Sequence, residues 1–150
     1  MKLRLVVLLV ITCFSAPTWT ASVDELISGT WAIAELRTAG VYSGGVQERA
    51  NQLIGKTIKV EDDGIYLPDG VVCQRTGVIE QDLEDPDFLD YSFGSFGGSF
   101  SELGITDSQA VIVETDCWGK SDLLLGEIWI ANDSNLIFIT IEGQWLLLER

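Results

Sequence analysis

The fold is decided at the C-terminus, which reads Leu-Ile-Phe-Ile-Thr-Ile at 136–141, Glu-Gly at 142–143 and Gln-Trp-Leu-Leu-Leu-Glu-Arg at 144–150. The first and last segments are apolar and rich in strand-forming residues, and Glu-Gly is a tight-turn pair. A preceding strand is predicted over Glu127–Ala131, with its turn at Asn132–Asn135. The chain therefore ends in three antiparallel strands. Their apolar face needs a cover, so the sheet is expected to close into a small barrel or to pack in a sandwich.

The rest of the chain contains more short strands at close spacing. They are predicted at 29–37, 57–60, 65–67, 71–73 and 110–114. Turn residues such as Asp62-Asp63-Gly64 and Asp69-Gly70 separate them. Apolar residues at helical spacing predict one short helical turn within Ser22–Ser28 and one helix over Val46–Ile54. The predicted fold class is mainly β, a small antiparallel β-barrel or sandwich with one or two short helices.

The N-terminus has the pattern of a secretory signal peptide. Lys2 and Arg4 accompany an apolar run, Leu5–Ile11, that is too short to span a membrane. We expect a signal peptide at 1–21 and a single β-rich domain at 22–150. The protein is therefore expected to be periplasmic or secreted.

Two alternatives for the processing site stay open. Cleavage after Ser15 is an alternative to cleavage after Ala21. In a lipoprotein, Cys13 would become the lipid-bearing first residue.

Cys73 and Cys117 are the two cysteines that follow the signal peptide. An even pair in an exported chain predicts a disulfide, and the alternative is two buried free thiols. The two positions are 44 apart (117 minus 73). A bond between them should stabilise the fold by about 3 to 4 kcal/mol in the chain-entropy model.

The composition is strongly acidic and lacks histidine. Without residues 1–21 the chain has 7 basic and 23 acidic residues, a net charge of −16. Such a surface repels nucleic acid and attracts a basic protein, although acidity also serves solubility alone. Without histidine, the Ser-His and Cys-His nucleophile systems and the usual zinc ligands are excluded. We expect that the protein is not an enzyme and binds no cofactor or metal. The composition leaves open a glycosidase with a pair of carboxylates and a Ca²⁺ site that lacks the usual loop motif.

Regular periodicity fails between Arg75 and Ile105, where a long loop is expected. Its candidate partner-binding residues are three carboxylates and three phenylalanines: Asp85, Asp87, Asp90, Phe93, Phe96 and Phe100. The carboxylates would steer a basic partner, and the rings would anchor it in a pocket. The alternative is that the rings fold back onto the sheet and the acids form a solvated rim.

Tryptophans are the largest apolar side chains of the predicted fold. Trp31, Trp118, Trp129 and Trp145 either line a ligand cavity or, as is more usual, fill the interior of a small barrel. Trp118, beside Cys117, is expected to be partly exposed.

The two ends of the mature chain carry a resemblance. Gly29-Thr30-Trp31 and the terminal strand Trp145–Arg150 resemble the lipocalin and calycin plan, in which the tryptophan of a G-x-W motif closes one end of the barrel beneath a late arginine. The resemblance implies a cation–π contact between Trp31 and Arg150. The helix at 46–54 departs from the lipocalin order. The chain equally resembles the small exported bacterial barrels that include lysozyme inhibitors, in which loops on a rigid barrel bind the target.

These observations lead to two hypotheses about function. In the first, the protein is an exported acidic binding protein, of the inhibitor or immunity type, that neutralises a basic partner such as a lysozyme-like or other cell-wall hydrolase. The alternative is a lipocalin-like carrier of a small apolar ligand, which requires a cavity inside the barrel.

Overall fold

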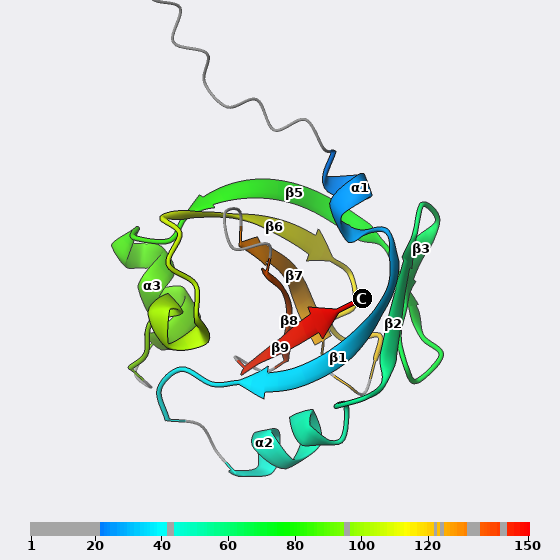
Figure 1. Ribbon diagram of the computed structural model, residues 1–150, viewed down its shortest axis with the longest axis horizontal. Helices are drawn as coiled ribbons and strands as arrows, with labels where there is room; N and C mark the ends of the chain where they lie inside the picture. Colours follow the sequence, from blue (N-terminus) through cyan, green and yellow to red (C-terminus); the bar gives the residue numbers. More distant parts are fainter. Residues whose placement is uncertain are drawn as a thin grey trace, which may run out of the picture.

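The computed structural model describes residues 22–41, 44–94, 97–121, 123, 125–131, 136–141 and 144–150. The predicted signal peptide with Cys13, the ring of Phe96 and the predicted turns at 132–135 and 142–143 lie outside these residues. The described strands are antiparallel and form one nine-stranded sheet that nearly closes into a barrel (Figure 1). The mainly β prediction is confirmed, and the barrel is the form that the sheet takes.

Short strands and helices make up this barrel. The strands are β1 (Gly29–Arg37), β2 (Thr57–Glu61), β3 (Gly64–Tyr66), β4 (Val72–Cys73), β5 (Arg75–Asp82), β6 (Gln109–Thr115), β7 (Leu125–Ala131), β8 (Leu136–Ile141) and β9 (Gln144–Glu149). The helices are α1 (Val23–Ile27), α2 (Gly44–Asn51) and α3 (Pro86–Phe93), with a 3-10 turn η2 (Phe100–Leu103). Helix α1 lies within the helical turn predicted at Ser22–Ser28. Helix α2 overlaps the helix predicted at Val46–Ile54 but ends at Asn51, and α3 was not predicted.

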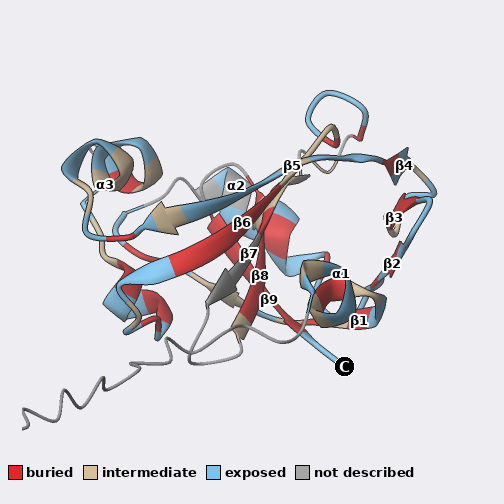
Figure 2. Cartoon of the chain, turned by 90° about the horizontal axis from the view of Figure 1, so that it is seen from above, coloured by how far each residue is buried: buried red, intermediate tan, exposed pale blue. Residues whose placement is uncertain are grey.

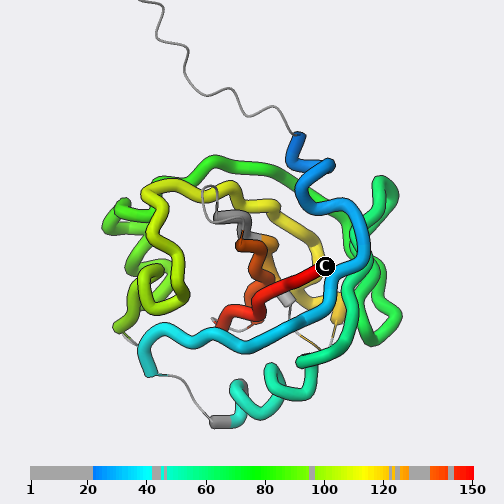
Figure 3. Tube along the Cα trace, viewed as in Figure 1, coloured from blue at the N-terminus to red at the C-terminus, as the bar shows by residue number. Residues whose placement is uncertain are grey.

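The order of strands in the sheet brings the two ends of the domain together. The order is β4-β3-β2-β1-β9-β8-β7-β6-β5, so β1 pairs with β9 (Figure 3). The outermost strands, β4 and β5, are consecutive in the chain, and Gln74 alone separates them. No ladder joins these two strands in the described part of the chain. The barrel therefore has a seam beside β5.

Strands β6, β8 and β9 bury side chains on both faces. In β9, Leu146 and Leu148 belong to one apolar cluster inside the barrel, and Trp145 and Leu147 belong to a second cluster on its outer face. The same division holds along β6 and β8, whose buried residues are visible in Figure 2. Burial on both faces explains why 136–141 reads as a continuous apolar run instead of alternating with polar residues. It also places Trp145 outside the barrel, so its predicted position in the interior was wrong.

A disulfide crosses the sheet near the seam. Cys73 in β4 is bonded to Cys117, just after β6, with 5.0 Å between their Cα atoms. Next to it, the backbone amide of Gln74 donates to the Asp116 carboxylate over 2.7 Å, and the backbone amide of Asp116 donates to the backbone carbonyl of Gln74 over 3.0 Å. The predicted pairing of the two cysteines is confirmed.

Helix α1 lies across one end of the barrel, next to the C-terminal residue. A capping box between Ser22 and Glu25 starts the helix, and Ile27 inserts into the interior cluster. The guanidinium carbon of Arg150 lies 4.5 Å from the centre of the Trp31 ring. Arg150 also donates to the Leu26 carbonyl over 2.9 Å. The contact that the lipocalin resemblance implied is therefore present at this end of the barrel.

The long loop expected between Arg75 and Ile105 is a wrong prediction. This segment forms β5, α3 and η2 instead. Strand β5 is half-exposed or fully exposed along its whole length, so burial imposes no apolar alternation on it. Helix α3 packs on the outer face of the barrel, where it covers apolar side chains of β6, β8 and β9.

Candidate functional site

Helix α3 carries most of the predicted partner-binding residues, and local signals define its ends. The Asp85 carboxylate caps the helix by accepting from the Phe88 amide over 2.9 Å, and Pro86 occupies the first turn. Gly94 ends the helix with a positive φ of 46°, a conformation that favours glycine. Asp85 is thus half-buried and occupied in holding the helix, so it is poorly placed to meet a partner.

The inner side of α3 is an aromatic cluster. The Phe93 and Phe100 rings meet edge to face with centroids 4.8 Å apart, and Phe100 meets Trp145 at 5.8 Å. Phe93 is 4% exposed and Phe100 is 6% exposed. These two rings are therefore not surface anchors. They fold back onto the sheet, which was the alternative prediction, because the outer face of β6, β8 and β9 is apolar and needs a cover.

The outer side of α3 is acidic and carries one exposed aromatic ring. Asp87 and Asp90 are both exposed. Tyr91, four residues after Asp87 and so on the same side of the helix, is 74% exposed. Its ring stacks on that of Phe88 with 6.3 Å between centroids. We call Asp87, Asp90 and Tyr91 the α3 surface.

Carboxylates from the neighbouring strands add to the charge around Tyr91. Glu127 of β7, partial burial and Glu114 of β6, in that order, raise the pKa of the Tyr91 hydroxyl above 10.0, because negative charge and lost hydration disfavour the phenolate. Carboxylates of two neighbouring strands, β6 and β7, therefore make the field at this ring negative. Sequence reasoning missed Tyr91, although tyrosine is enriched at protein–protein interfaces.

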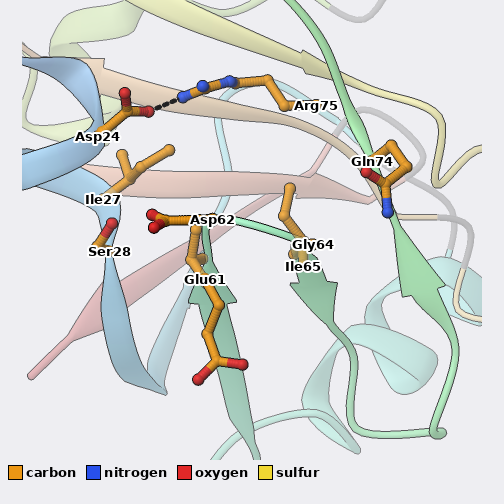
Figure 4. Close-up of a pocket in the computed structure, with 10 residues that line it drawn as sticks. Asp24, Ile27, Ser28, Glu61, Asp62, Gly64, Ile65, Gln74 and Arg75 are labelled. Carbon is orange, nitrogen blue, oxygen red and sulfur yellow. Dashed lines mark hydrogen bonds and ion pairs between the residues drawn. The ribbon is translucent and has the colours of Figure 1, made fainter.

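A pocket of about 240 Å³ lies at the seam of the barrel. Its walls come from α1, from the β2–β3 hairpin and from Gln74 and Arg75 (Figure 4). Asp24 and Arg75 form an ion pair across it, which fastens α1 to the first residue of β5. Glu61 and Asp62 make the opposite wall acidic. The ion pair thus holds α1 against β5 at this end of the seam.

The middle of the barrel is filled by side chains. Ile58, Val113, Ile139 and Leu146 face the interior and have no exposed surface, and Ile128 is 1% exposed. A cavity that admits water would give accessible surface to the side chains that border it. These residues therefore border no room for a ligand, which argues against the carrier hypothesis. The side chain of Trp129 lies outside the described part.

The remaining tryptophan lies at the surface. Trp118 is exposed beside the disulfide, as predicted. Within the described ranges, no three Cys, Asp or Glu side chains are placed to hold a metal ion. None of the helices in those ranges is long and apolar enough to cross a membrane.

The structure brings together part of the predicted site. Asp87 and Asp90 share the exposed side of α3, Asp85 caps its N-terminus, Phe93 and Phe100 lie beneath it, and Phe96 is not among the described residues. Comparison with protein-family models, with curated proteins and with solved structures found no match to the chain.

Proposed function

We propose that the protein is an exported acidic binding protein that neutralises a basic protein partner, such as a lysozyme-like or other cell-wall hydrolase. The α3 surface is its contact site. The disulfide is compatible with an oxidising compartment outside the cytoplasm. The hydrolase class rests on the resemblance to exported bacterial barrels, and the basic character of the partner rests on charge.

One observation carries the proposal: Tyr91 is largely exposed, and the carboxylates of Glu127 and Glu114 act on its hydroxyl. Tyrosine is enriched among the residues that contribute most to protein–protein binding, because its large ring loses little conformational entropy on burial. The surrounding acids attract lysine and arginine and raise the rate of encounter. The formal net charge of −14 extends this attraction over the whole surface.

The packing beneath α3 supports a role in recognition. Phe93 and Phe100 fix the inner side of the helix to Trp145, and the Asp85 cap fixes its start. The exposed side is therefore held on a rigid barrel instead of a loop. A preorganised surface loses less conformational freedom on binding.

Affinity capture tests the proposal directly. The folded protein is immobilised and exposed to an extract of its source organism and of competing bacteria, and bound proteins are eluted with a salt gradient. A basic hydrolase that elutes early and loses activity when the protein is added would support the proposal, because screening weakens charge attraction. A retained partner that is acidic or neutral, or whose binding does not depend on salt, contradicts it.

Variants then locate the contact. Asp87→Asn with Asp90→Asn should slow association about tenfold at low salt and change dissociation little. The matched control, Glu48→Gln with Asp62→Asn, removes the same charge from other parts of the surface and should have a smaller effect. Tyr91→Ala should instead speed dissociation, by about thirtyfold if the ring is a binding hot spot. Equal effects of the two double variants would show that only net charge matters and that α3 is not the contact.

A further inference from the structure

Strand β5 is the last strand of the sheet and has one free edge. Its hydrogen-bonded neighbour is β6, and no described strand pairs with its other side. The Leu83 amide donates to the Ser108 carbonyl over 2.9 Å, one step beyond the last pair of the β5–β6 ladder. Backbone groups alternate in direction along a strand, so Ile79 and Gln81 also face β6, and Val78 and Glu80 direct their N–H and C=O groups outward.

Both faces of β5 are uncovered near its middle. Val78 and Ile79 are consecutive, so their side chains lie on opposite faces, and they are 44% and 42% exposed. Val113, which lies opposite Val78 in the ladder, is fully buried inside the barrel. The barrel interior is therefore sealed at β6, while β5 extends beyond it as an open strand.

The charge of this edge decides what can pair with it. Glu80 and Asp82 are exposed on β5, and the α3 surface follows directly in the chain. The basic residue of the strand, Arg75, is paired with Asp24. A second copy of the chain would bring two surfaces of net charge −14 together, and charges on edge strands normally oppose such self-pairing. An extended segment rich in lysine or arginine is attracted instead.

We propose that β5 is a docking edge to which an extended basic segment of the partner protein adds as a further strand. Backbone bonds to Val78 and Glu80 supply the register. The apolar side chains of the segment lie on the face of Ile79, and its basic side chains lie on the opposite face, where they meet Glu80 and Asp82. The inference rests on the proposed basic partner, and it adds the conformation in which that partner binds.

The test uses a synthetic peptide of alternating lysine and valine, as long as the eight residues of β5. It is added to the folded protein while hydrogen exchange of individual backbone amides is followed. Exchange at Val78 and Glu80 should slow at least about tenfold, since each amide gains a partner. A peptide with glutamate in place of lysine, and one N-methylated at alternate residues, should both fail to protect these amides.

Val78→Pro removes one outward N–H and is tolerated at a free edge, whereas Val78→Ala keeps the N–H. The proline variant should bind the lysine peptide about tenfold more weakly than the alanine variant does. Absence of peptide binding, binding without amide protection, or equal binding of the N-methylated peptide would overturn strand addition.

These outcomes separate the two proposals. Loss of partner binding in the α3 variants, with no protection of β5, leaves the basic-partner proposal standing and removes strand addition. Protection of β5 by the peptide, together with failure to capture any basic protein, keeps the docking edge and removes the proposed partner class.

Discussion

Removal of the Cys73–Cys117 bond should destabilise the barrel by about 4 kcal/mol. The bond closes a loop of 44 positions, and the chain-entropy relation gives about 4 kcal/mol for a loop of that size. Since Cys73 lies in β4 and Cys117 follows β6, the bond also joins the two sides of the seam. For a domain of this size the loss corresponds to a fall in melting temperature of about 10–20 °C.

The measurement is urea unfolding of the oxidised protein, the reduced protein and the Cys73→Ala/Cys117→Ala variant. Reduction keeps the sulfur atoms and isolates the crosslink, whereas the variant also removes buried volume and should lose at least as much stability. Hydrogen exchange should accelerate most in β3 and β4, with β8 as the control. If the oxidised and reduced proteins differ by less than about 1 kcal/mol, the seam is held by other contacts and the reasoning is wrong.

Three further changes probe the core and the α3 surface. Gln144 is fully buried, and its side-chain amide has no hydrogen-bond partner among the described residues. Gln144→Met should therefore raise the free energy of unfolding in urea denaturation by about 1–3 kcal/mol, whereas a loss of stability would show that the amide has a structural role. Phe100→Ala should cost about 3–5 kcal/mol because the ring is buried against Phe93 and Trp145, and a change below about 1 kcal/mol would return this ring to the surface. Glu127→Gln should lower the pKa of Tyr91 toward 10.0 because one negative charge is lost, while Glu114 and partial burial keep it raised. Ultraviolet titration measures this pKa, and the Tyr91→Phe variant identifies the signal of Tyr91. An unchanged pKa would place Glu127 too far from Tyr91 to act on it.

The sequence predicts the interior strands well because burial leaves a pattern. The strand predicted at 136–141 coincides with β8, and Ala110–Glu114 lies within β6. The disulfide was predicted from an even pair of cysteines in an exported chain, and the Trp31–Arg150 contact was predicted from a family resemblance. In each case the prediction rested on residues under one strong constraint, either burial of apolar side chains or a specific chemical pair.

Strand β5 escaped prediction because neither of its faces is buried. Gly77, Glu80 and Gln81 interrupt any apolar alternation, and the strand exists through its ladder with β6. Ladder hydrogen bonds join backbones and leave no signature in side-chain type. The free edge of β5 could therefore be found only from the structure.

The sequence contains a signal for helix α3, although a loop was predicted there. Asp85-Pro86 is a favourable N-cap and first-turn pair, yet the glycines after Phe93 suggested a flexible loop. The geometry of the helix then determines which of its residues face solvent and which face the barrel. Residues four apart share a side, whereas residues two apart are separated by about 200° around the axis. Asp87 therefore lies on the same side as Tyr91, and Phe93 lies opposite Tyr91, so exposure of Tyr91 directs Phe93 into the barrel wall.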